Sequence, residues 1–341
     1  MAISKTMRVA AALFVRAALP PLDASCTFER QDPKKSSNLL KTVTALGTVA
    51  VAVWAGDAMA LEGPTPYLPG VTVGIPIGAL PPPGFYFSDN NVILEGGLKG
   101  NNGNSLPANA SVYLNIPTAL WVPNFKIFGA TYAAALTQPY VQQNLDLSDL
   151  GAGKSISNGF FNTIVSPYNL SWNLNPFFIK TGLGIYLKDG FYQSNTLPSG
   201  VKVTSAAAIA NNFWTFEPDL ALSYLENDWN LTLHAVFDFN TKNNTTNYQS
   251  GDVFYLDFTA GKSFGKWTVG AGGNITQQFD NDVSRGAVVN GNGHRFQQIL
   301  LGPYAGYDFG PVSLNARILQ SVHAENGFNT SQYHLGISFP F

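Results

Sequence analysis

The sequence predicts an all-β fold, a transmembrane antiparallel up-and-down β-barrel of about twelve strands, with fourteen as the alternative count. Charged residues make up only 12% of the chain, whereas about a quarter is usual in soluble proteins. The connections between the predicted strands alternate between short turns and long loops. The final residues, from Tyr333 to Phe341, place a large apolar side chain at every second position. Together these features indicate strands that cross a membrane.

The N-terminal stretch 1–60 reads as an export signal region. Residues 34–60 carry a basic start, an apolar segment over 42–54 and the small-residue cleavage site Ala58-Met59-Ala60. Residues 1–33 are interpreted as an over-long gene start. Cleavage after Ala60 would leave a chain that begins at Leu61.

Composition excludes several functional classes. Cys26 is the only cysteine and lies in the signal region, so the exported chain has no disulfide or thiolate metal site. The net charge is −2, and no basic face for nucleic acid is visible. We therefore expect no metal, no cofactor and no nucleic-acid partner.

Residues 61–84 contain so much Pro and Gly that they cannot form a wall strand. They are either a periplasmic tail or a plug inside the barrel, and the sequence leaves both readings open. The barrel itself is assigned to residues 85–341.

From residue 91 onward the chain divides into segments long enough to cross a bilayer as tilted strands, which takes about nine to eleven residues each. The expected strands are 91–100, 109–121, 126–142, 158–172, 175–188, 212–225, 228–240, 252–264, 266–280, 294–309, 311–325 and 330–341. Every second connection is a short turn, such as Gly265 or Gly310-Pro311. The connections between them, notably 189–211, 241–251 and 281–293, are long and rich in Gly, Asn and Ser. This sorting of connections is the plan of bacterial outer-membrane barrels.

Side-chain alternation assigns inside and outside within single strands. In 228–240, Trp229, Leu231 and Leu233 share one face, whereas Asn230, Thr232 and His234 share the other. The polar face must point into the lumen, because lipid cannot form hydrogen bonds. Most tryptophans fall beside the short turns, where the bilayer interface favours them.

This alternation places ten candidate residues on the lumen wall. They are Lys180, Tyr186, Glu217, Asp219, His234, Asp238, Tyr255, Asp257, Tyr304 and Arg317. The functional interpretation is a polar constriction that selects solutes, and the structural one is a set of neutralised pairs that hold the barrel rigid. The two can coexist. We predict that Arg317 lies within salt-bridge range of Glu217, Asp238 or Asp257, because an unpaired buried guanidinium is costly.

Several stretches resemble the phenol meta-pathway degradation protein (MetA-like) family of outer-membrane transporters. They are PPGFY at 82–86, FWTFEP at 213–218, NYQSGD at 247–252, GKW at 265–267 and SFPF at 338–341. The resemblance implies a small outer-membrane barrel that admits hydrophobic compounds. The C-terminal aromatics Tyr333, Phe339 and Phe341 likewise resemble the signal recognised by the barrel-assembly machinery.

The first functional hypothesis is a passive channel in the bacterial outer membrane for small hydrophobic or aromatic compounds. Its expected partners are outer-membrane lipid and lipopolysaccharide, the barrel-assembly machinery and small hydrophobic solutes. A structural or adhesive surface protein is the alternative. An outer-membrane enzyme is a third hypothesis, but chance proximity explains inward Ser, His and Asp equally well, so we expect no enzyme and no catalytic residue.

Overall fold

The computed structural model describes residues 62–63, 65–150 and 153–341, all within one compact unit. The predicted signal region 1–60 lies outside the described residues. In the described part of the chain, no helix is long and apolar enough to cross a membrane.

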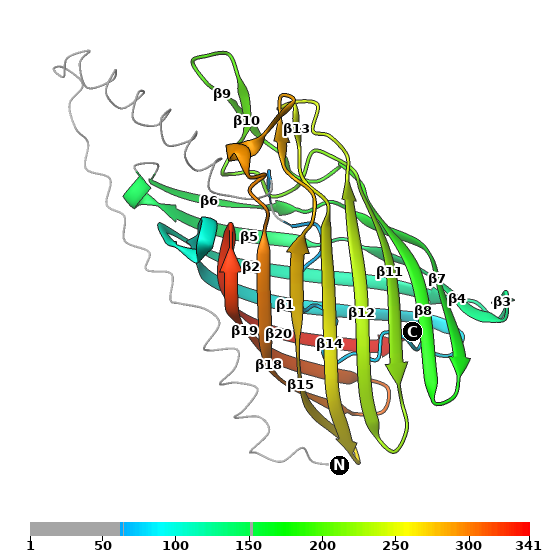
Figure 1. Cartoon of the computed structure of the whole chain (residues 1–341). Helices are drawn as coiled ribbons and strands as arrows, with labels where there is room; N and C mark the ends of the chain where they lie inside the picture. The colour runs from blue at the N-terminus through cyan, green and yellow to red at the C-terminus, as the bar shows by residue number, and fades with distance from the viewer. Residues whose placement is uncertain (1–61, 64, 151–152) are drawn as a thin grey trace, which may run out of the picture. The chain divides into compact units, whose positions relative to one another are not determined.

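Twelve antiparallel wall strands form a closed barrel (Figure 1). In chain order they are β1 (Gly84–Lys99), β2 (Ser105–Val122), β4 (Ala130–Thr137) continued by β5 (Tyr140–Leu147), β6 (Gly153–Phe160) continued by β7 (Ile164–Leu174), β8 (Phe177–Tyr186), β11 (Thr215–Tyr224), β12 (Trp229–Asn240), β14 (Val253–Phe264), β15 (Trp267–Gln278), β18 (Gln297–Asp308), β19 (Ser313–Glu325) and β20 (Gly327–Pro340). The ring closes between β1 and β20, which pair from Tyr86↔Pro340 to Lys99↔Gly327. The predicted fold class and strand count are confirmed.

The third and fourth wall strands are each interrupted once. Pro139 lies between β4 and β5 and has no N–H to donate, while Gln138 N–H still bonds Pro117 O at 3.2 Å. Residues 161–163 form the matching break between β6 and β7, where Phe161 N–H bonds Pro139 O at 2.9 Å. The third strand is displaced from its predicted limits of 126–142, since it starts at Ala130 and ends at Leu147. The fourth extends beyond its predicted limits of 158–172 at both ends, from Gly153 to Leu174.

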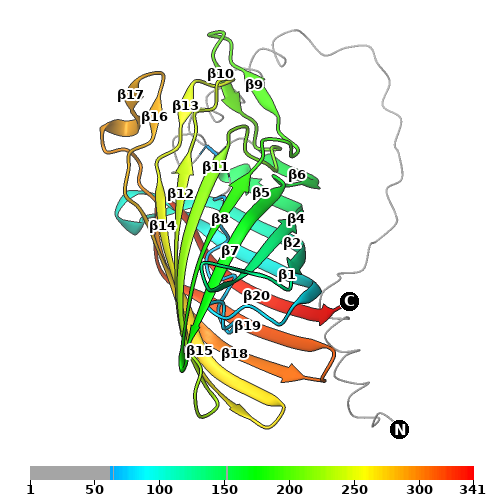
Figure 2. The same cartoon turned by 90° about the vertical axis from the view of Figure 1, so that its right-hand side faces the viewer.

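The two ends of the barrel differ. One end carries short turns, several of which use a left-handed residue, such as Asn227 (φ 52°), Gly265 (φ 64°) and Gly310 (φ 101°). The other carries the long loops, which hold β9 (Ser194–Thr196), β10 (Lys202–Thr204), β13 (Tyr248–Gln249), β16 (Val283–Ser284) and β17 (Ala287–Val288) (Figure 2). The short strand β3 (Lys126–Ile127) lies beside the first turn.

Side chains of β12 alternate as the sequence predicts. Leu231 and Leu233 are exposed on the outer face, whereas Thr232 and His234 are buried inside. Aromatic rings gather at the short-turn end: Trp121 stacks on Phe85 at 6.2 Å between ring centroids, and Lys262 Nζ lies 5.1 Å from the Trp229 ring. The outer wall thus has an apolar band with an interfacial aromatic girdle.

The described part of the N-terminal segment runs through the lumen from the long-loop end to the short-turn end. Glu62 meets the long loops, where Thr204 Oγ1 and Asn243 Nδ2 donate to its carboxylate at 2.8 and 3.1 Å. Farther along, Gly78 N–H bonds Ser223 Oγ at 3.0 Å on β11. The chain then enters β1 at Gly84.

Candidate functional site in the barrel lumen

Asp257 of β14 holds one turn of the N-terminal segment against the wall. Its carboxylate accepts from Gly70 N–H at 2.9 Å, Thr72 N–H at 3.0 Å, Thr72 Oγ1 at 2.7 Å and Tyr67 Oη at 2.8 Å. Asn274 of β15 donates a further bond at 2.7 Å. The side chain is 2% exposed, so its charge is balanced by these donors rather than by water.

Arg317 of β19 binds the same turn through opposite groups. Its guanidinium donates to Val73 O at 3.0 Å and to Val71 O. Asn315 Oδ1 accepts another bond at 3.1 Å and Asn90 Oδ1 one at 3.4 Å. Carbonyl oxygens therefore serve as the acceptors of this cation.

The predicted salt bridge of Arg317 is wrong for the described residues. The ion pairs found there join other residues, and none joins Arg317 to Glu217, Asp238 or Asp257. The physical reason is the segment itself, whose carbonyls bind Arg317 while its N–H groups bind Asp257. The backbone of the segment therefore lies between the Arg317 guanidinium and the Asp257 carboxylate.

A second polar group joins three neighbouring strands. Lys180 Nζ of β8 lies 2.5 Å from Asp219 Oδ1 of β11, and His234 Nε2 of β12 lies 3.2 Å from the same oxygen. Lys180 also donates to Asn169 Oδ1 at 3.2 Å, and Thr72 Oγ1 lies 3.2 Å from His234 Nδ1. The segment therefore touches this group as well.

Glu217 and Asp238 form a third polar group with two tyrosines. Tyr186 Oη donates to Glu217 Oε2 at 2.7 Å. Asp238, fully buried, accepts from Tyr67 N–H at 3.3 Å and lies beside Tyr255, whose ring is 5.0 Å from that of Tyr67. These carboxyl groups are thus held by hydroxyl and backbone donors.

Tyr304 of β18 lies flat against a wall of glycines. A Cβ atom at Gly261 would lie 1.8 Å from its hydroxyl, and one at Gly270 would lie 2.7 Å from its ring. Its buried ring packs with Val73 and Leu300. Gly261 of β14 and Gly270 of β15 therefore make room for a lumen tyrosine.

The opposite side of the lumen is mainly apolar, and the candidate residues did not include it. The side chains that line the cavity there come from β1, β2 and β5, and the polar ones among them include Ser88, Asn90, Thr118 and Gln143. We define the apolar stripe as Leu94, Leu98, Ala110, Val112, Leu114, Ile116, Leu120, Val141, Leu145 and Leu147. A cavity of about 1510 Å³ separates the stripe from the segment and extends to both ends of the barrel.

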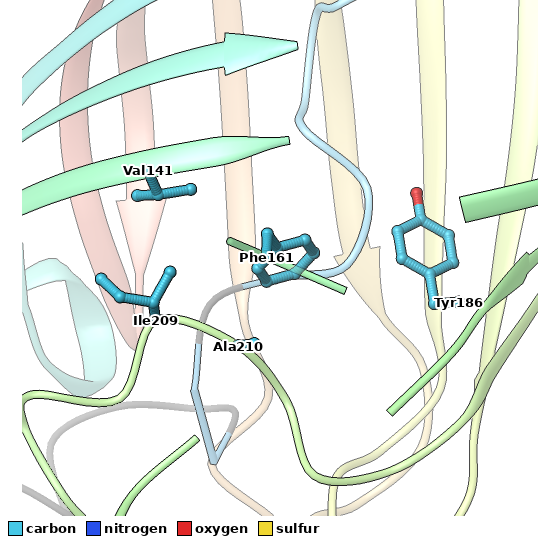
Figure 3. Close-up of a cluster of buried hydrophobic side chains, with 5 residues drawn as sticks. All are labelled: Val141, Phe161, Tyr186, Ile209 and Ala210. Atoms are coloured by element: carbon cyan, nitrogen blue, oxygen red, sulfur yellow. The ribbon is translucent and has the colours of Figure 1, made fainter. Parts of the chain in front are cut away.

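The long loop 187–214 covers the cavity at one end. Phe161, Tyr186, Ile209 and Ala210 pack with Val141 in a buried cluster (Figure 3). The loop is fixed beside this cluster because Asn211 N–H donates to Asn162 Oδ1 at 2.8 Å and Asn162 Nδ2 donates to Asn211 O at 2.9 Å.

A family model described as "Putative MetA-pathway of phenol degradation" matches residues 96–335. The chain belongs to that family. Among solved structures, a COG4313 outer membrane channel from Pseudomonas putida F1 has a TM-score of 0.67 at 13% identity, covering 77% of this chain and 97% of that chain. At this identity the likeness shows a shared fold.

Two other barrels have TM-scores below 0.5. The CymD monoaromatic hydrocarbon channel has a TM-score of 0.38 at 11% identity, covering 76% of this chain and 89% of its own. The translocator domain of autotransporter NalP from Neisseria meningitidis has a TM-score of 0.42 at 12% identity, covering 76% and 88%. A search of curated proteins found no match.

The protein lies in the bacterial outer membrane. Outer-membrane barrels have short periplasmic turns and longer extracellular loops, so the short-turn end is periplasmic and the long-loop end faces outward. The C-terminal aromatics lie on the outer wall at the periplasmic side: Phe341 is 80% exposed, and its N–H bonds Phe85 O at 2.8 Å. Phe339 packs on Phe341 at 5.7 Å, and Tyr333 is exposed farther up β20.

Proposed function

We propose that the protein is a passive channel that admits small hydrophobic or aromatic compounds across the outer membrane. The apolar stripe carries this proposal, because it lines one side of a continuous cavity. A polar solute gains nothing from such a wall. An apolar solute that leaves water there is stabilised by roughly 25 cal/mol for each Å² of apolar surface it buries.

The ten predicted lumen residues act mainly by excluding polar solutes in this proposal. Most of their charged groups bind one another or the N-terminal segment, as in Lys180–Asp219 and Asp257–Thr72. Among the charged ones, Asp238 Oδ1 and Arg317 Nε are buried without a hydrogen-bond partner, and the segment fills the polar side of the lumen. Passage is then confined to the apolar side.

Uptake into liposomes tests the proposal. Leu114→Asn places an amide in the middle of the apolar stripe, and Leu114→Met is the matched control because it keeps the site apolar. We expect the asparagine variant to slow phenol or toluene entry about tenfold, equivalent to about 1.4 kcal/mol, with glucose entry unchanged. Equal toluene entry for both variants would remove the stripe from the pathway.

The proposal requires that compounds pass unchanged. Phenol recovered from the liposome lumen should be chemically intact by chromatography, and any turnover by the purified protein would favour the enzyme hypothesis.

We also propose that export removes residues 1–60, which mass spectrometry of the extracted protein can test through a first residue at Leu61. We propose in addition that the exported barrel contacts lipopolysaccharide and is inserted by the barrel-assembly machinery.

A further inference from the structure

A carboxyl group with an open oxygen lies at the outer end of the cavity. Glu217 is found near the start of β11 and Tyr186 ends β8, so both lie at the extracellular end, beside the long loop 187–214. Tyr186 Oη donates to Glu217 Oε2 at 2.7 Å. Among the residues that the structure describes, no N–H or hydroxyl group donates to the other oxygen, Oε1.

The neighbouring strand leaves this oxygen uncovered. Glu217 pairs with Gly184 of β8, and a Cβ atom at Gly184 would lie 3.2 Å from Glu217 Oε1. The glycine has no such atom to cover the oxygen. Fully buried polar atoms without a partner include Asp238 Oδ1 but not Glu217 Oε1. Since Glu217 is half-buried and lines the cavity, a solute in the cavity can reach Oε1.

Acceptors outnumber donors around Glu217. The next carboxyl group, Asp238 of β12, lies beside it. Tyr186 Oη and Tyr67 N–H supply one donor each, and Tyr255 Oη, beside Asp238, can supply a third. Two carboxyl groups offer far more acceptor sites than three donors fill, and within the described residues no cation forms an ion pair with either. A ligand that donates a hydrogen bond suits this site.

Apolar side chains line the cavity next to the open carboxylate oxygen. The Tyr186 ring packs against Phe161 at 6.4 Å between ring centroids (Figure 3). Val112, Leu114 and Ile164 pack against the same buried cluster, line the cavity and are half-buried. The site thus combines an apolar wall with one acceptor at its edge, which is the usual composition of a small-molecule site.

The chemistry of this site favours one class of solute. Any solute that binds there displaces water from Glu217 Oε1. A hydroxyl group can donate the lost hydrogen bond, whereas a methyl group leaves the carboxylate desolvated and unpaired. An ammonium group also donates, but it must give up the hydration of a full charge beside apolar walls. An uncharged aromatic solute with a hydroxyl group therefore fits best.

We propose that Glu217 is the acceptor of a subsite that recognises the hydroxyl group of an aromatic solute entering from outside. Tyr186 occupies Oε2, which leaves Oε1 for the solute, and the aromatic ring of the solute lies along the apolar wall. The inference rests on the proposed channel function and places phenol-type compounds ahead of plain hydrocarbons among its solutes.

Equilibrium dialysis of the purified protein in detergent, with protein-free micelles as the blank, tests the subsite. Phenol, anisole and toluene are the probes, because all three are small monosubstituted benzenes and only phenol has an O–H group. Glu217→Met should weaken phenol binding about tenfold, equivalent to about 1.4 kcal/mol, and change anisole and toluene binding less than about twofold. Glu217→Gln is the matched control, since it keeps an acceptor oxygen and should retain most of the phenol affinity. Unchanged phenol binding in Glu217→Met, or equal weakening of all three probes, would overturn the proposal.

A second variant, Tyr186→Phe, tells the two polar groups apart. Loss of the hydroxyl frees Glu217 Oε2, so phenol binding should be retained or become tighter. Phenol binding that weakens about tenfold with Glu217 in place would show that the solute binds the tyrosine, which would overturn the proposal. Because dialysis measures no transport, the two hypotheses fail separately. Absent toluene uptake by liposomes would refute the channel, whereas phenol binding that does not depend on Glu217 would refute the subsite.

Discussion

At the scale of single residues, Asp257 and Arg317 bind opposite poles of one turn of backbone. The Asp257 carboxylate accepts hydrogen bonds from N–H groups of this turn, and the Arg317 guanidinium donates to its carbonyl groups. Hydrogen bonds to charged groups contribute about 1.5–3 kcal/mol each, so the two side chains together hold the segment more firmly than the apolar contacts of Val73 do. Their partners could not be predicted, because the segment has no periodic pattern that fixes its path.

Asp257→Asn should loosen this attachment. The amide keeps one oxygen and loses the charge, so the hydroxyl groups of Tyr67 and Thr72 lose acceptor sites. We expect single-channel conductance in planar bilayers to rise as the segment leaves the wall more often. Asp308→Asn is the control, since that carboxyl bonds only the exposed turn at Gly310. Identical conductance for the two variants would mean that Asp257 does not hold the segment.

Burial raises the pKa of Asp282, in an extracellular loop, to about 7, and raises that of Glu62. An unfolded aspartate has a pKa of about 3.9, so the folded loops bind the proton more tightly. Their stability is therefore fully present below about pH 4 and is lost as pH rises toward 7.

Hydrogen exchange at Gly251, whose N–H bonds Asp282 Oδ1 at 2.7 Å, reports this effect. After correction for intrinsic rates, we expect greater protection at pH 5 than at pH 8 in the parent protein. Asp282→Asn should flatten the difference, whereas Asp280→Asn, at an exposed carboxyl, should retain it. Equal protection of the Gly251 N–H at pH 5 and pH 8 in the parent protein would show that the Asp282 carboxyl does not control the stability of the loops.

At the scale of elements, alternation predicts strands well where lipid and lumen differ in polarity. Strands β12 and β15 follow their predicted limits within two residues. Strands β1, β2 and β5 reverse the rule, with Leu94 and Leu114 inside and Asp89 and Asn115 outside. The rule fails there because it assumes a polar lumen, and the cavity beside this sector is lined mainly by apolar side chains.

The last strand depends on its terminal residue. Deleting Phe341 removes the N–H bond to Phe85 O and the ring contacts with Phe339 and Phe87 at the seam where the barrel closes. We expect much less heat-modifiable, protease-resistant barrel in outer-membrane fractions. Phe341→Tyr keeps an aromatic terminus and should restore the level. Normal yield after the deletion would show that the seam closes without this residue.

At the scale of the whole molecule, the N-terminal segment fills part of a lumen that the wall strands alone would leave open. A twelve-stranded barrel is wider than an eight-stranded one, whose own side chains fill the interior. Here the N-terminal segment occupies one side and leaves the other as a cavity of about 1510 Å³. The sequence predicted the wall but left tail and plug undecided, because Pro and Gly exclude a strand without choosing a location.

Replacing residues 65–79 with a Gly/Ser linker of equal length should empty the polar side. Ion conductance should increase severalfold and thermal stability should fall, since the bonds to Asp257 and Arg317 are lost. Toluene uptake should persist, because the apolar stripe is untouched. A Pro81→Ala variant, outside the replaced stretch, is the control. Unchanged conductance would mean that the segment does not limit the opening.

The path of the segment also gives the chain the topology of a threaded ring. Residue 62 lies at the outer mouth, yet the segment joins the wall at the periplasmic end. Either the barrel wall closes around the segment when β1 pairs with β20, or the segment passes up through the lumen after the wall has closed. A folded protein domain is wider than the lumen, so a domain fused directly ahead of residue 62 could reach its place only by the first order of events. Surface display of such a fusion would therefore reveal whether threading precedes closure.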